Sequence, residues 1–115
     1  MADVETRVEL TCLLDFYGPL LTEHRREVLR LYCEEDLSLA EIAEQEAISR
    51  QGVHDTVHKA QKQLEEYEEK LGLLARYRRM TQGLARCGEL LAGAQEEDAV
   101  KARALIGELI KDEEG

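Results

Sequence analysis

The stretch "LSLAEIAEQEAISRQGVHDTVHKA", residues 37–60, contains two helix-start signals only eleven residues apart. Ser38 and Glu41 have the spacing of a capping box, so a short helix is expected from Leu39 to Glu46. Ser49 is a favourable N-cap for a longer helix that follows. About three residues remain to join the two helices, and so short a joint predicts a helix-turn-helix.

Small and apolar residues occupy the positions where the two helices must meet. Ala43 allows a close approach, and the wedge between the helices is expected to be filled by Ile42, Ile48, Val53 and Val57. Two residues depart from the usual pattern. Ala47, within the joint Glu46-Ala47-Ile48, stands where glycine is usual, and a left-handed backbone there would cost about 1 kcal/mol. Gly52 is expected to loosen the start of the second helix by a similar ~1 kcal/mol.

Helical patterns also flank this stretch on both sides. We expect one helix from about Glu5 to Tyr17, ended by Gly18-Pro19, and another after the N-cap Thr22. The long helix after Ser49 continues an apolar stripe of Val53, Val57, Ala60, Leu64, Tyr67, Leu71 and Leu74. Spacing alone leaves open whether Gly72 ends that helix. Further helices are expected in residues 73–91 and 97–114, and no strand pattern is present.

These patterns predict an all-α protein in two parts. Residues 1–63 should form a helix-turn-helix bundle, and residues 64–115 a helical extension. The extension is too short to bury its own apolar set, Leu90, Leu91, Leu105, Ile106, Leu109 and Ile110. We therefore expect it to serve dimerisation or partner binding, and a homodimer would also suit paired DNA half-sites.

Charge and composition restrict the possible partners. The chain has 25 acidic and 15 basic residues, a net charge of -10, and neither residues 1–63 nor residues 64–115 are net basic. Any nucleic-acid contact must therefore come from a local patch. No stretch approaches the ~18 apolar residues of a membrane span. The charged N-terminus is unlike a secretory signal. The cysteines Cys12, Cys33 and Cys87 lie far apart in the sequence, and this spacing favours free thiols in a reducing cytoplasm.

The outward face of the second helix-turn-helix helix is the candidate DNA-binding site. It should carry Arg50, Gln51, His54, Asp55, His58, Lys59 and Lys62. Arg50 and Gln51 could hydrogen-bond base edges, whereas Lys59, Lys62 and either Arg25 or Arg26 could hold phosphates. An alternative remains open, because Asp55 and the acidic side chains of the preceding helix oppose DNA. In that case the fold is a scaffold whose face binds protein or nothing.

His54 and His58 have the four-residue spacing of a zinc motif, but aspartate replaces the usual glutamate and no third ligand stands out. We therefore expect no metal and no cofactor. No phosphate-binding loop or nucleophile motif is present, so we also expect no enzymatic activity.

The segment from Leu21 to Leu74 resembles region 4 of sigma factors, a helix-turn-helix bundle of the winged-helix superfamily type. It resembles more closely the YlxM family of small bacterial proteins, which "LLDFYGPLLTEHRREVL" (13–29) and "EEYEEKLGLL" (65–74) also match. The resemblance implies a cytoplasmic regulatory protein linked to the signal recognition particle pathway. Two functions follow as hypotheses: a DNA-binding regulator, or an accessory that binds the GTPase or the RNA of that particle.

Overall fold

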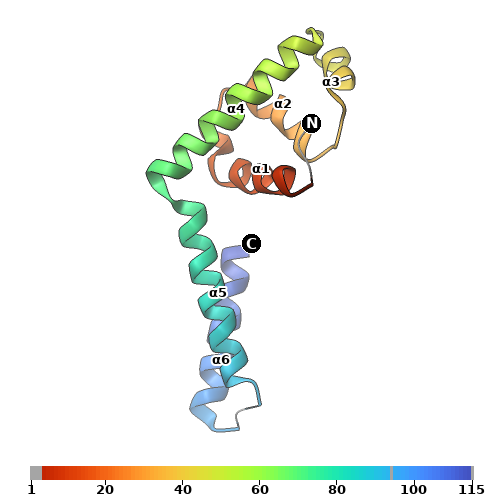
Figure 1. Ribbon diagram of the computed structural model, residues 1–115. Coiled ribbons are helices and arrows are strands. Elements are labelled where there is room, and N and C mark those ends of the chain that lie inside the picture. Colours follow the sequence, from red (N-terminus) through yellow and green to blue (C-terminus); the bar gives the residue numbers. More distant parts are fainter. Residues whose placement is uncertain (1–3, 94, 115) are drawn as a thin grey trace. The chain divides into compact units, whose positions relative to one another are not determined.

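The computed structural model describes residues 4–93 and 95–114, and within these ranges the protein is helical without any strand (Figure 1). The elements are α1 (Val4–Tyr17), a 3-10 turn η1 (Gly18–Leu20), α2 (Glu23–Cys33), α3 (Leu39–Glu46), α4 (Arg50–Leu71), α5 (Leu73–Leu91) and α6 (Glu97–Glu114). The predicted all-α fold is confirmed. No helix in the described part of the chain combines the length and the apolar character that crossing a membrane requires.

The chain forms two compact units, Met1–Leu74 and Ala75–Gly115. The boundary expected after residue 63 falls inside α4, which continues without a break to Leu71. The physical reason is that Leu64, just past that point, is completely buried in the first unit. The last two turns of α4 therefore belong to the helix-turn-helix unit and not to an extension.

The core of the first unit lies where α4 packs against α1, α2 and α3 (Figure 1). The side chains without any exposed surface come from all four helices: Tyr17, Val28, Leu29, Ile42, Val53, Ala60 and Leu64. Burying one such aliphatic side chain contributes about 1.5–3 kcal/mol. Packing of the α4 stripe is therefore the main force that holds the helix-turn-helix in place.

The predicted caps start the helices. Ser38 Oγ accepts a hydrogen bond from the Glu41 backbone N–H at 3.1 Å, and the Glu41 carboxylate accepts one from the Ser38 N–H. These hydrogen bonds from Ser38 hold the pKa of the Glu41 carboxyl below its usual range. Ser49 Oγ caps α4 by accepting from the Gly52 N–H at 2.9 Å. Thr22 caps α2 in the same way.

Two left-handed residues end the helices of the helix-turn-helix. Ala47 ends α3 with φ 57° and ψ 41°, as its place in the tight joint required. Gly72 ends α4 with φ 61° and ψ 26°, which answers the question that spacing left open. Because α4 stops there, Leu71 is 56% exposed and leaves the predicted buried stripe, whereas Leu74 is buried.

A buried tyrosine secures the chain at Gly72. The Tyr17 hydroxyl donates to Glu68 Oε1 at 2.6 Å and accepts from the Leu73 N–H at 3.1 Å. Glu68 Oε1 also accepts from the Leu74 N–H at 3.0 Å. Side chains of α1 and α4 thus satisfy the first backbone donors of α5. Burial, together with the Glu68 hydrogen bond, raises the pKa of Tyr17 above its ordinary value of 10.0.

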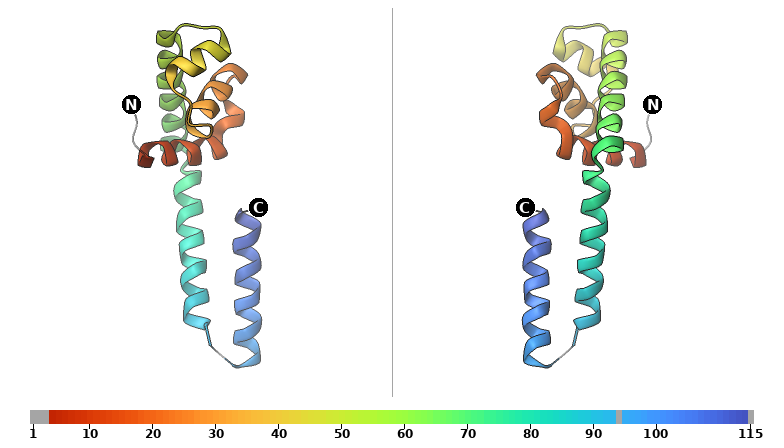
Figure 2. Two further views of the ribbon diagram at one scale, coloured as in Figure 1. Left: turned by 90° about the vertical axis from the view of Figure 1, so that its right-hand side faces the viewer. Right: turned by 90° about the vertical axis from the view of Figure 1, so that its left-hand side faces the viewer.

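The second unit is a helical hairpin in which α5 and α6 run antiparallel (Figure 2). Arg103 Nη1 donates to the Leu91 carbonyl at 3.3 Å and links α6 to the end of α5. None of the side chains described for residues 75–111 is fully buried. Leu90, Leu105 and Leu109 are 68%, 57% and 44% exposed, so the hairpin leaves much of its apolar surface uncovered.

We expect Ala47→Gly to stabilise the first unit by about 0.5–1 kcal/mol, because glycine adopts positive φ without the Cβ clash of alanine. Part of the gain is offset by the freedom that glycine adds to the unfolded chain. Urea unfolding followed by circular dichroism measures the change. Ala40→Gly, on the exposed side of α3, is the matched control and should destabilise by about 0.5–1 kcal/mol. A loss of stability in Ala47→Gly would show that the left-handed backbone of Ala47 is not strained.

We expect the free energy of unfolding to fall above pH 10 because of Tyr17. The unfolded chain releases this proton near pH 10.0, whereas the folded chain holds it to higher pH. The stabilisation is therefore complete below pH 10 and declines as the pH rises through the folded-state pKa. Urea unfolding between pH 8 and 11 tests this against Tyr17→Phe, which should be less stable at pH 8 and show a shallower decline. Parallel pH profiles would refute it.

Candidate nucleic-acid interface

All seven α4 residues predicted to face outward are exposed. They share one side of the helix, opposite the buried stripe that includes Val53, Val57 and Ala60. We call this set the contact face: Arg50, Gln51, His54, Asp55, His58, Lys59 and Lys62. It begins in the first turn of α4, at the end next to α3, and covers thirteen residues or about 20 Å of helix.

Side chains of the contact face interact with one another. Gln51 Nε2 donates to Asp55 Oδ1 at 2.9 Å, and His54 Nδ1 lies 3.6 Å from the same oxygen. The rings of His54 and His58 are parallel within 1° and their centroids are 6.4 Å apart. Asp55 is therefore turned toward neighbours on its own helix, and its carboxylate is partly compensated. To bind an adenine edge, the Gln51 amide must exchange this intrahelical partner for the base.

Gly52 has a packing role that helix propensity alone did not reveal. A Cβ built at this position would lie 3.1 Å from Ser49 Oγ and 3.8 Å from the side chain of Ile48. The absence of a side chain lets the Gly52 N–H approach the Ser49 cap closely. Gly52 thus costs helix propensity but makes room for the tight joint, which a sequence argument based on helix formation misses.

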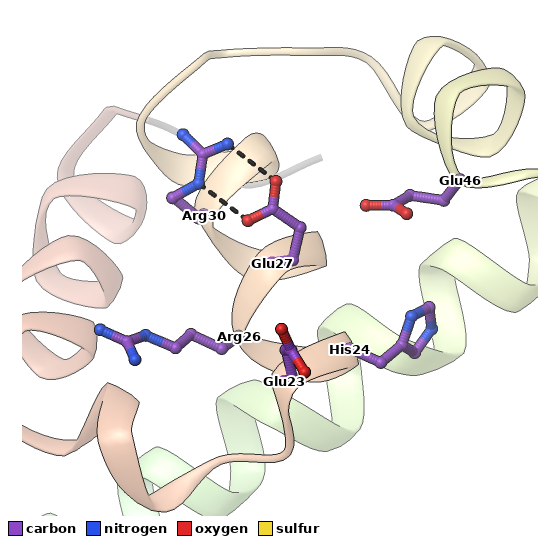
Figure 3. Close-up of a pocket in the computed structure, with 6 residues that line it drawn as sticks. All are labelled: Glu23, His24, Arg26, Glu27, Arg30 and Glu46. Atoms are coloured by element: carbon purple, nitrogen blue, oxygen red, sulfur yellow. Dashed lines mark hydrogen bonds and ion pairs between the residues drawn. The ribbon is translucent and has the colours of Figure 1, made fainter.

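The two arginines proposed for phosphate binding lie in different places. Arg25 is half-buried, and its Nη1 donates to Gln63 Oε1 at 2.8 Å, so it lies against α4 just beyond Lys62. Arg26 is exposed and points to the opposite side of α2 from His24 (Figure 3). Only Arg25 is held beside the contact face.

A cleft lies between α2 and the end of α3 (Figure 3). It is lined by Glu23, His24, Arg26, Glu27, Arg30 and Glu46. Arg30 Nη2 and Nε bind the two Glu27 carboxylate oxygens at 2.8 and 3.0 Å, which lowers the pKa of Glu27. His24 is exposed and lies on the side of α2 that faces Glu46. The mixture of signs in this cleft gives it no preference for an anion.

No metal centre is formed by the side chains that the structure describes. Nowhere among them do three or more His, Cys, Asp or Glu residues gather in a way that could hold an ion. Cys12, Cys33 and Cys87 are free, and burial raises the pKa of the Cys33 thiol to about 11, so that thiol is protonated at neutral pH. Protonated thiols are poor nucleophiles and poor ligands.

The formal charge changes sign along α4. Residues 50–62 contain three basic residues and one acidic residue, a net charge of +2. Residues 64–71 contain four glutamates and one lysine, a net charge of -3. The positive end of the helix dipole adds to the positive half. The first three to four turns of α4 are therefore locally positive, and the turns beyond them are locally negative.

Comparison with known proteins agrees with this architecture. Residues 4–103 match the family described as "UPF0122: Putative helix-turn-helix protein, YlxM / p13 like". A UPF0122 protein of Symbiobacterium thermophilum is 42% identical over 106 residues, covering 92% of this chain and 96% of its own. The UPF0122 protein YlxM of Bacillus subtilis is 37% identical over 99 residues, covering 86% and 90%. The chain therefore belongs to the YlxM/p13-like helix-turn-helix family.

Proposed function

We propose that this protein is a DNA-binding regulator that places the first turns of α4 in the major groove. The observation that carries the proposal is the contact face itself: seven exposed polar residues with net charge +2, presented by a helix whose other side is buried. Arg50 and Gln51, at the N-terminal end, are the candidates for base contacts, each worth about 1–3 kcal/mol of discrimination. Lys59 and Lys62 are the candidates for phosphate contacts.

The acidic remainder of the chain supports selective rather than indiscriminate binding. Attraction to phosphate is confined to about 8–10 Å at physiological salt, so the net charge of -10 weakens long-range encounter with bulk DNA. Glu65, Glu66 and Glu69 are exposed just past Lys62 and repel a duplex that lies along the whole of α4. Only a duplex that fits the first turns closely gains from Arg50 and Gln51.

We further propose that the protein acts as a homodimer in the cytoplasm. The uncovered leucines of α6, Leu105 and Leu109, support this because a second hairpin could bury them in a four-helix arrangement. A two-fold dimer also matches paired half-sites on DNA.

An accessory role in the signal recognition particle pathway is the second candidate. The net charge of -10 and the exposed glutamates of α4 favour it, because they oppose binding to duplex DNA. Its partners would be the GTPase or the RNA of the particle, which only the family resemblance suggests. In that role the contact face would bind a protein or a folded RNA.

We expect Arg50→Ala/Gln51→Ala to abolish preference for a selected duplex while leaving the melting temperature nearly unchanged, because both side chains are exposed. Lys59→Glu should weaken binding to all duplexes at least tenfold. The few phosphate contacts of Lys59, Lys62 and Arg25 should by themselves contribute about -3 to the slope of log K against log salt. Fluorescence anisotropy with duplexes selected from a random pool measures these quantities.

Lys70→Glu, near the end of α4, is the matched control for Lys59→Glu and should leave the affinity unchanged. If the wild-type protein binds no duplex at about 50 mM salt, the proposed DNA-binding function is wrong. The accessory role then explains the structure better. Full-strength binding to the selected duplex by the Arg50/Gln51 double variant would also overturn the proposed roles.

We expect the wild-type protein to sediment as a dimer at about 100 μM, far above the Kd of an ordinary dimer. Leu105→Glu/Leu109→Glu should give a monomer, because two carboxylates cannot be buried at an apolar interface without a large penalty. Leu20→Glu, an exposed leucine of the first unit, is the control and should leave the dimer intact. A monomeric wild-type protein at that concentration would contradict the dimer.

A further inference from the structure

We propose that α5 carries a second DNA-binding surface, in which Arg76, Arg79 and Arg86 hold the sugar–phosphate backbone of a duplex. This surface belongs to the second unit and is separate from the contact face on α4. The inference rests on the proposed function, since both surfaces would bind the same class of ligand. It adds a site that reads no sequence but contributes affinity and salt dependence.

The three arginines form a stripe along one side of α5. Arg76, Arg79, Gly83 and Arg86 follow one another in steps of three, four and three residues, which keeps them on one face of a helix. All four are exposed. Most half-buried residues of α5 lie outside this stripe: Tyr77, Arg78, Thr81, Leu84, Gly88 and Leu91. Half-buried Ala75 borders the stripe at the start of the helix. From Arg76 to Arg86 the stripe spans about 15 Å, the rise of roughly four base pairs.

The charges of the stripe are available to a ligand. Within the described residues, Arg76 and Arg79 have neither an ion-pair partner nor a side-chain hydrogen bond. Arg86 Nη1 lies 3.3 Å from Glu89 Oε2, but both side chains are more than two-thirds exposed. An exposed pair of this kind contributes little stability, so Arg86 can exchange Glu89 for a phosphate.

Gly83 lowers the surface in the middle of the stripe. A Cβ at this position would meet no atom within 4 Å, so no packing requirement of the hairpin explains the glycine. A glycine inside a helix costs about 0.5–1 kcal/mol relative to alanine. Here it leaves a shallow place between Arg79 and Arg86 where a sugar–phosphate chain can approach the helix backbone.

Charge and shape favour duplex phosphate over other anionic partners. α5 contains four arginines and one glutamate, a net charge of +3 in a chain of -10. Arginine presents a planar fork that binds two phosphate oxygens at once, and α5 contains no lysine. An anionic membrane would instead require the apolar side of α5, where Tyr77, Leu84 and Leu91 are already half-covered.

The test combines two sets of substitutions in the full-length protein. We would measure anisotropy of a fluorescent 20-base-pair duplex for wild type, Arg50→Ala/Gln51→Ala, Arg76→Gln/Arg79→Gln/Arg86→Gln, and all five together. The α5 triple variant should bind at least tenfold more weakly at about 50 mM salt. Its slope of log K against log salt should be shallower by about 2 to 3, since each phosphate contact contributes about 0.9. Preference for the selected duplex should be unchanged.

The control removes the same charge elsewhere. Lys70→Gln/Lys101→Gln/Lys111→Gln neutralises three exposed lysines outside the stripe and should leave both the affinity and the slope nearly unchanged. An equal loss in this control would show a general charge effect and overturn the inference. Sedimentation of the α5 triple variant as a monomer, when wild type is a dimer, would assign the stripe to contact between copies and would also overturn it.

The two proposals fail in different ways. If the Arg50/Gln51 variant loses preference for the selected duplex while the α5 triple variant binds like wild type, the proposed DNA-binding surface on α5 is wrong. The proposed role of the contact face is then retained. If only the α5 triple variant loses affinity and no variant changes the preference for the selected duplex, the arginine stripe binds DNA. The proposed base contacts of α4 are then wrong.

Discussion

Burial of one side of α4 under α1, α2 and α3 determines where every residue of the contact face points. Val53, Ala60 and Leu64 are completely enclosed, so the helix cannot rotate without exposing them. A rotation of half a turn would cost several kilocalories per mole and would bury lysine and arginine in their place. The contact face is therefore an obligatory consequence of the core, and its chemistry depends only on which residues occupy the outer positions.

The ends of α4 are fixed by different means. Before its start, Ala47 adopts a left-handed backbone, and Gly52 leaves room for the Ser49 cap. These two features form the tight joint of the helix-turn-helix. At the other end, Gly72 breaks the helix, and Tyr17 with Glu68 satisfies the donors that the break exposes. Because both ends are held by side chains of the first unit, α4 keeps its outer face in a fixed orientation, which the proposed binding to a DNA groove requires.

Much of this arrangement could be predicted from local sequence signals. Ser38, Glu41 and Ser49 act over one helical turn, so their capping roles follow from spacing alone. The different placements of Arg25 and Arg26 could not be predicted, because they depend on the Arg25–Gln63 contact between α2 and α4. The boundary between the units was also hidden, because Leu64, Leu71 and Leu74 follow one periodic pattern, which does not show that the first unit ends only at Leu74. Likewise, helix propensity indicates that Gly52 destabilises α4. It does not show that the missing side chain lets the Gly52 backbone approach Ser49 closely.

Charge, more than shape, distinguishes the possible functions of this fold. A helix-turn-helix in a chain of net charge -10 can bind DNA only where positive residues are locally concentrated, as on the first turns of α4. The most direct measurement is an NMR titration of the isotopically labelled full-length protein with a short duplex at low salt. We expect that amide shifts between residues 49 and 62 change most within the first unit, and that those of residues 64–71 change little. Unchanged signals across residues 49–62 in the presence of bound duplex would contradict it.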